Sequence, residues 1–341
     1  MKNTKKIIAF VAMLAIVAVA CFALVACGEK PGDKGGDKDI IENVTFSAPE
    51  GTPALAMLRL ATDNAKIGDI SVTYKVVKPA NIAAEMSAKK SDIVIMPVNA
   101  GANLIRQGAG YKLVSIAVDG SLYMVGNTEK GGKISIDDIK GKKIACIGQT
   151  GVPGLVFRYV LSANGITIVD ENTTPSENQV SVRYAPDGTA AAQLLKGGQV
   201  DFMVVGEPAA TAQSNKLKLN AEMNLQSEYA KASGANNYPQ AGLFVSERLY
   251  SNEKFMNELF SALAASKKWV SENKADVTEF AKQHLYESAN FPEIAIERCA
   301  LNATHLDDVQ KAQVITFLEK VMPKDAKGNA IDWQSTKSLI F

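Results

Sequence analysis

The chain has 341 residues, of which 47% are apolar and 21% are charged, and its net charge is +1. This length is sufficient for two domains of ordinary size with a substantial buried core. Because the net charge is close to zero and the basic residues are spread along the chain, the composition excludes the charge pattern of a nucleic-acid-binding protein.

The N-terminus has the pattern of an export signal. Met1–Lys6 is basic, Ile7–Ala26 is an uninterrupted apolar run, and the run ends in Leu24-Val-Ala-Cys27. A basic start followed by an apolar stretch and small residues predicts a signal peptide over residues 1–26. The alternative is an uncleaved membrane anchor, because twenty apolar residues are enough to span a bilayer.

The end of the apolar run resembles the lipobox of bacterial lipoproteins. This resemblance implies that Cys27 is lipid-modified and becomes the mature N-terminus. Cys21 is a weaker second candidate, because Ala18 rather than leucine stands three places before it. Residues 28–39 contain no hydrophobic side chain, so we expect residues 27–41 to form a lipidated cysteine followed by a flexible tether.

After the tether, hydrophobic periodicity predicts strands and helices in alternation. The expected strands are residues 44–47, 70–77, 92–96, 112–118, 121–126, 143–147, 179–184, 201–205 and 238–245. The expected helices are residues 53–63, 80–89, 100–107, 153–163, 188–196, 208–215, 252–273, 276–284, 293–300 and 307–321. Polar residues 127–133 suit a crossing between two lobes, and residues 216–237 receive no assignment.

Two pairs of stretches repeat one design. Residues 44–54 and 143–154 each read as a short strand, a glycine loop and a helix that opens on proline. Residues 91–100 and 200–209 each follow an Ala-rich helix with an Asp, an apolar strand and a polar loop. Glycine admits tight turns, and the free N–H groups of a helix start attract polar or anionic groups. The repeats therefore predict two matched α/β units with ligand-facing loops at the carboxyl ends of their strands.

Two cysteines lie in the expected folded body, Cys146 and Cys299. The apolar strand around Cys146 favours two separate buried thiols, and a disulfide is the alternative. No Cys/His spacing typical of a metal site is present in the sequence, and we expect neither a metal nor another cofactor.

Four motifs in order along the chain resemble those of a known family. They are Ser47-Ala-Pro-Glu-Gly-Thr-Pro53, Asp92-Ile-Val-Ile-Met-Pro-Val-Asn99, Ile139-Lys-Gly-Lys-Lys-Ile144 and Gly206-Glu-Pro-Ala-Ala210. From about residue 42 to its end, the chain resembles solute-binding lipoproteins of ABC importers, in the nitrate, taurine and thiamine-precursor class. The resemblance implies the α/β periplasmic-binding-protein fold of type II, with two lobes, a ligand cleft between them and C-terminal helices. Residues 42–127 with 240–341 would form lobe 1, and residues 128–239 would form lobe 2.

The resemblance also implies a set of cleft residues. It places the following residues at the ligand: Gly51, Thr52, Pro53, Val98, Asn99, Gln149, Thr150, Gly151, Gly206 and Glu207. Glu207 has two interpretations, because its carboxylate suits either a ligand amine or the start of the following helix. Tyr123 and Tyr238 lie near the crossing strands, where they either stack on a planar ligand or pack internally. No Arg or Lys occurs within the four loops, and Arg106, Arg158 and Arg183 are the nearest cations by position.

The expected function is the extracytoplasmic substrate-binding component of an ABC importer. It would capture a small polar or heterocyclic solute, such as a thiamine precursor, a sulfonate or nitrate, by closure of the lobes. The expected partners are a permease and its ATPase, with the protein monomeric and lipid-anchored at the outer face of the bacterial cytoplasmic membrane. A sensor that presents its ligand to a receptor is an alternative function.

An enzyme of pyrimidine synthesis with the same fold is a further alternative. That chemistry needs a histidine near the cleft, whereas His284 and His305 fall in the C-terminal region away from every predicted loop. The sequence therefore favours a binding protein over an enzyme.

Overall fold

The computed structural model describes residues 41, 43–62 and 65–341, and residues 41–341 form one compact unit. The predicted signal peptide, the lipidation of Cys27 and the tether up to residue 40 lie outside the described residues. None of the described helices is long and apolar enough to cross a membrane.

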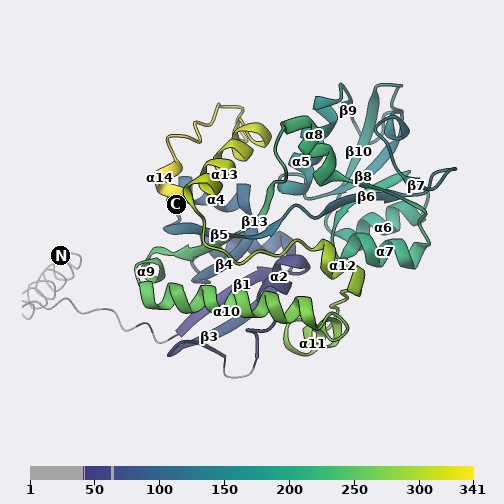
Figure 1. Cartoon of the computed structure of the whole chain (residues 1–341). Coiled ribbons are helices and arrows are strands. Elements are labelled where there is room, and N and C mark those ends of the chain that lie inside the picture. Colours follow the sequence, from purple (N-terminus) through teal and green to yellow (C-terminus); the bar gives the residue numbers. More distant parts are fainter. Residues whose placement is uncertain (1–40, 42, 63–64) are drawn as a thin grey trace, which may run out of the picture. The chain divides into compact units, whose positions relative to one another are not determined.

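The unit contains two sheets, each surrounded by helices (Figure 1). In spatial order, the strands of the first sheet are β2 (Lys66–Ile67), β3 (Ile70–Val77), β1 (Asn43–Pro49), β4 (Ile93–Pro97), β13 (Pro239–Ser246) and β5 (Tyr111–Asp119). Those of the second sheet are β7 (Gly132–Lys133), β12 (Ala221–Asn224), β6 (Leu122–Gly126), β11 (Phe202–Gly206), β8 (Lys143–Ile147), β10 (Gln179–Ala185) and β9 (Thr167–Val169).

The two sheets have the same internal order. In the first, β3, β1 and β4 are parallel and β13 runs antiparallel beside β4. In the second, β10, β8 and β11 are parallel and β6 runs antiparallel beside β11. The repeated stretches of the sequence therefore occupy equivalent places, β1 with β8 and β4 with β11. The predicted pair of matched α/β units is confirmed.

The helices connect these strands and then cover the first sheet. Those that follow strands are α2 (Thr52–Ala56), α3 (Ile82–Ser87), α4 (Val98–Arg106), α5 (Val152–Ala163), α6 (Gly188–Lys196), α7 (Ala209–Leu217) and α8 (Leu225–Ser233). The C-terminal ones are α9 (Glu247–Tyr250), α10 (Glu253–Glu272), α11 (Val277–His284), α12 (Glu293–Arg298), α13 (Asp308–Val321) and α14 (Lys337–Ile340). Two short 3₁₀ turns occur at Pro79–Asn81 and Asp137–Ile139.

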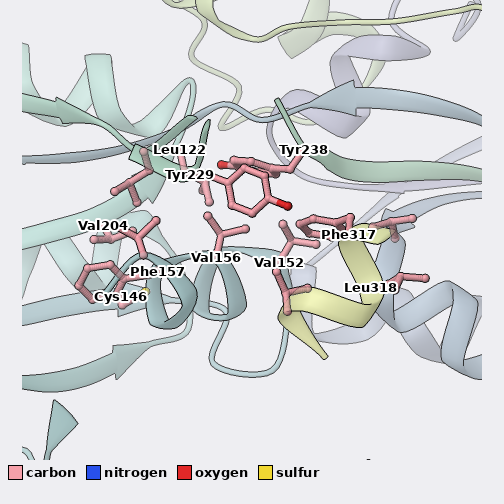
Figure 2. Packing of buried hydrophobic residues seen from close by; sticks show 14 of the residues in the cluster. Leu122, Cys146, Val152, Val156, Phe157, Val204, Tyr229, Tyr238, Phe317 and Leu318 are labelled. Atoms are coloured by element: carbon pink, nitrogen blue, oxygen red, sulfur yellow. The ribbon is translucent and has the colours of Figure 1, made fainter. Parts of the chain in front are cut away.

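The central strands are apolar along their whole length because helices cover both of their faces. Four of the five residues of β4 are buried, as are four of the five residues of β11. One hydrophobic cluster is shared by both sheets and joins Met96 to Met124 and Val204. Its part between the sheets includes Val152 and Val156 of α5, which lie near Phe317 of α13 (Figure 2).

The chain crosses between the sheets twice, and the first crossing differs from the prediction. We expected strand 121–126 in the first lobe and the crossing at 127–133. Instead, β6 pairs with β11 and β12 in the second sheet, so the chain crosses at Asp119–Ser121. It returns between α8 and β13, and the two crossings meet where Gly120 N donates to Tyr238 O at 2.9 Å. The strand that runs antiparallel beside β4 (β13) and the one that runs antiparallel beside β11 (β6) therefore each come directly after a crossing between the sheets.

These crossings define the lobes. We propose that lobe 1 comprises residues 43–119 and 239–341 around the first sheet, and that lobe 2 comprises residues 122–237 around the second. The structure also differs from the sequence-based expectations for one helix and for one segment that received no assignment. The helix expected over 53–63 ends at Ala56 and continues as turns through Leu60, and unassigned residues 216–237 contain β12 and α8.

Candidate ligand-binding site

Four loops at the carboxyl ends of strands form the candidate site. They follow β1, β4, β8 and β11, and each leads to the start of a helix. In the first sheet β1 pairs in parallel with β4, and in the second sheet β8 pairs in parallel with β11. The two loops of each sheet therefore lie at one edge of that sheet. The predicted residues of each lobe are therefore gathered at one edge, as the repeated pattern requires.

The loops of one lobe touch those of the other directly. Thr52 Oγ1 donates to the main-chain oxygen of Glu207 at 2.7 Å, which joins the loop after β1 to the loop after β11. Asn99 Nδ2 donates to the main-chain oxygen of Thr150 at 2.9 Å, which joins the loop after β4 to the loop after β8. Four residues that the sequence singled out thus meet in two pairs across the lobes.

Asn99 stands in the first turn of α4 with one polar atom unused. Its side chain is 2% exposed, and Val98 beside it is fully buried. While its amide nitrogen donates to Thr150, its Oδ1 atom accepts no hydrogen bond from the described residues. Because an unsatisfied buried acceptor costs about 1–3 kcal/mol, this atom is suited to a donor group brought by a ligand.

The loop after β8 is shaped by Gly148. Its φ of 63° is in the left-handed region that favours glycine, and its oxygen accepts from the N–H groups of Gly151 and Gly154. Arg158 of α5 donates to the Gln149 oxygen at 2.8 Å, fixing the loop from the side. Gln149 and Thr150 remain exposed, so this loop presents their side chains to solvent.

The loop after β1 has a comparable arrangement. Gly51 has φ 96°, again a conformation that favours glycine, and a Cβ there would meet no atom within 4 Å. Its N–H donates to the hydroxyl of Tyr286 at 3.1 Å. Pro53 is half-buried at the start of α2, where no backbone donor is required.

Glu207 follows Gly206 at the end of β11 and is engaged inside the protein. Its carboxylate accepts from the main-chain N and the hydroxyl of Thr211, at 3.1 and 2.9 Å, and so caps the start of α7. Its Oε1 also lies 2.7 Å from Nε of Arg298, as an ion pair rather than a well-aligned hydrogen bond. Burial raises the pKa of Glu207, and the charge of Arg298 opposes this rise. The helix-capping interpretation of Glu207 is therefore the one that the geometry matches.

The two tyrosines also have internal partners. The guanidinium of Arg298 lies 3.7 Å from the ring centroid of Tyr123. Tyr238 is 1% exposed, its ring stacks on Phe317, and its hydroxyl donates to Gln226 at 2.8 Å. These contacts match the internal-packing interpretation of Tyr238.

The cations noted in the sequence have different places. Arg158 supports the loop after β8, and Arg106 donates to Asn103 within α4. Arg183 lines a pocket of about 140 Å³ that also includes Lys143, the first residue of β8, and so lies away from the loops that follow the strands. A second pocket, of about 340 Å³, is lined by residues of β7, β12 and α8 and by none of the predicted site residues.

Sequence reasoning did not identify Arg298 and Tyr286 as neighbours of the loops. Both lie in the C-terminal region, more than 230 residues after Gly51. No local motif marks them, since a single Arg at the end of a helix or a single Tyr after one has many possible roles. Only their contacts with Glu207 and with the Gly51 N–H bring them to the site.

The two buried cysteines are free thiols, and Cys299 Sγ lies 3.2 Å from the Thr52 hydroxyl.

No protein-family model matches the sequence, and no curated protein matches it. Solved structures are similar in fold. An ABC transporter from Parabacteroides distasonis has a TM-score of 0.66 and 21% identity, covering 85% of this chain and 96% of its own. The periplasmic aliphatic sulphonate binding protein of Escherichia coli has a TM-score of 0.58 at 12% identity, with coverages of 86% and 96%. The periplasmic nitrate-binding protein of Synechocystis PCC 6803 has a TM-score of 0.58 at 15% identity, with coverages of 88% and 86%.

These similarities cover 85–88% of the chain. At such low identities they establish the architecture rather than the ligand. The chain has the two-lobed α/β fold of the periplasmic binding proteins of ABC transporters.

Proposed function

We propose that the protein is the extracytoplasmic substrate-binding component of an ABC importer. It captures a small polar or heterocyclic solute between its lobes and delivers it to a membrane permease and its ATPase. The body acts as a monomer and is held at the outer face of the cytoplasmic membrane through a lipid on Cys27. The fold of known binding proteins and the export pattern of the N-terminus both support this proposal.

The observation that carries the proposal is the unused oxygen of Asn99 beside a contact that spans the lobes. Its Oδ1 atom is buried and has no partner among the described residues, while its Nδ2 atom already reaches Thr150 in the opposite lobe. A ligand with an N–H or O–H group would satisfy this oxygen, and the closing loops would exclude competing water. The surrounding groups are Gly51, Thr52, Pro53 and Val98 from lobe 1, and Gln149, Thr150, Gly151 and Gly206 from lobe 2.

The function is tested by thermal unfolding of residues 28–341 against two groups of compounds. One group contains small anions such as nitrate and sulfonates, and the other contains planar nitrogen heterocycles such as pyrimidines. A ligand at about a hundred times its dissociation constant stabilises the folded state by about 2.7 kcal/mol. We expect a heterocycle with an N–H donor to raise the unfolding temperature, because the buried atom offered by Asn99 is an acceptor.

The variant Asn99→Leu removes this acceptor while filling similar space, and we expect it to lose the ligand-induced shift. Asn103→Leu is the matched control, because it lies one turn later in α4, its side chain accepts a hydrogen bond from Arg106 of the same helix, and the change should leave the shift unchanged. If Asn99→Leu binds as tightly as the unaltered protein, the site lies elsewhere. If the ligand is converted to a product, the protein is an enzyme and the proposal is wrong.

A further inference from the structure

Arg298, the last residue of α12, lies among three groups of the second lobe. Its Nε atom is 2.7 Å from Oε1 of Glu207, and its Nη2 atom donates to Oε2 of Glu222 at 2.9 Å. Its guanidinium carbon lies 3.7 Å from the ring centroid of Tyr123. One side chain thus forms two ion pairs and a cation–π contact.

The helix that carries Arg298 packs on the first lobe through its buried side and also contacts α7 of the second lobe. Its residue Ile296 and the adjoining Cys299 belong to a buried cluster with Leu55 and Leu58, which follow β1. The three partners of Arg298 instead lie on the second sheet, on β6, at the end of β11 and on β12. Arg298 therefore joins the two lobes through side chains of the protein itself, without a ligand taking part in the contact.

Burial makes this contact stronger than an ordinary surface pair. The side chain of Glu207 is fully buried and that of Arg298 is 22% exposed, whereas the side chain of Glu222 is 48% exposed. A buried carboxylate that loses its cation is strongly destabilised, while an exposed pair contributes little. Separation of the lobes would remove Arg298 from Glu207 and from the face of Tyr123. The dominant opposition to opening therefore comes from Glu207, with smaller contributions from Tyr123 and Glu222.

We propose that Arg298 is a latch that holds the two lobes closed through Glu207, Glu222 and Tyr123, independently of any ligand. The latch lies beside the candidate site, because the main-chain oxygen of Glu207 also receives the hydrogen bond of Thr52. The position of the C-terminal helix α12 therefore affects whether a ligand can enter the candidate site between the loops of the two lobes. The inference concerns the free protein, so it stands or falls separately from the proposed transport function.

The test measures the distance between the lobes in residues 28–341 prepared without added ligand. Ser261→Cys in α10 and Lys196→Cys in α6 supply one exposed labelling position on each lobe, while both native cysteines are buried. Pulsed electron paramagnetic resonance between spin labels at these positions reports closed and open populations. We expect Arg298→Gln to lower the ratio of closed to open molecules by about tenfold or more, because the closed form would then hold the buried carboxylate of Glu207 without its cation.

The matched control is Arg248→Gln, because Arg248 also pairs closely with a carboxylate, that of Asp92, but within lobe 1. It should leave the distance distribution unchanged. Glu222→Gln alters only a half-exposed partner and is expected to shift the distribution in the same direction by a smaller amount, which provides a second test if Arg298→Gln folds poorly. An unchanged distribution in both Glu222→Gln and a folded Arg298→Gln, or an equal shift in Arg248→Gln, would overturn the latch.

Discussion

Gly154, rather than the loop glycine Gly151, is the position where a methyl group should disturb the loop after β8. A Cβ on Gly154 would lie 2.6 Å from the Gly148 oxygen, 2.8 Å from the Gln149 oxygen and 3.0 Å from the Gln149 Cα. These are backbone atoms of the loop, so they cannot move aside without changing its shape. At Gly151 the nearest atoms to a Cβ are 3.6 Å or more away and φ is −90°, so alanine fits there.

The expected cost of Gly154→Ala follows from two opposing effects. Overpacking against fixed atoms costs about 1–3 kcal/mol. Alanine gains up to about 1 kcal/mol over glycine within a helix, and Gly154 is the third residue of α5. With the full alanine gain, the net loss in the free energy of unfolding is about 0–2 kcal/mol, and we expect about 1 kcal/mol, against a change within about 0.5 kcal/mol for Gly151→Ala.

Urea unfolding followed by circular dichroism measures both variants. A lower midpoint for Gly154→Ala, with an unchanged dependence on urea, would show a loss of stability without a change in the unfolded state. The same variant should also weaken ligand binding, because the displaced loop carries the Thr150 oxygen that Asn99 contacts. If Gly154→Ala is as stable as the unaltered protein or more stable, the close approach of this helix to the loop is refuted.

Two further predictions concern buried ionisable groups. Burial raises the pKa of Asp119, at the end of β5, to about 6, so in the folded state it keeps a proton that the unfolded chain has released between about pH 4 and pH 6. The free energy of unfolding should therefore fall as pH rises through this window, by at most about 3 kcal/mol relative to Asp119→Asn; urea unfolding at pH 4 to 7 checks this, and a constant difference between the two proteins would contradict it. Burial also raises the pKa of Cys146 and of Cys299 to about 12, so we expect iodoacetamide to add to neither thiol in folded residues 28–341 at pH 8 and to both after denaturation without reductant. Mass spectrometry measures this addition, and rapid labelling of the folded protein or no labelling of the denatured protein would contradict the buried-thiol assignment.

Most elements could be predicted from the sequence because their signals are local. The helix over residues 188–196 has the predicted bounds, and the strand over residues 143–147 also matches. The similar sequences around Gly51 and Gly151 predict that the two stretches occupy equivalent positions in two sheets, and β1 and β8 occupy such positions. Residues 216–237 escaped assignment because β12 has only four residues and α8 has a mixed, largely polar surface.

The candidate site was predictable only in part. Loops that follow parallel strands must gather at one sheet edge, so the pattern predicts the four loops, and the family resemblance identifies Thr52, Asn99 and Thr150 within them. Their pairing across the lobes was not predictable, since it depends on how two sheets far apart in sequence face each other. The two roles considered for Glu207 were also not separable, because Arg298 approaches it from 91 positions later in the chain.

The sequence by itself determined the alternation of strands and helices, the duplicated design and the loops that begin helices on glycine and proline. These features depend on residue spacing and on the conformations of single residues. Only the tertiary structure decided that β6 belongs to the second sheet, that Tyr238 packs on Phe317, and that Arg298 reaches across the lobes. Strand pairing, stacking and ion pairs of this kind join residues that are distant in the chain, so their energy depends on three-dimensional packing that no local pattern encodes.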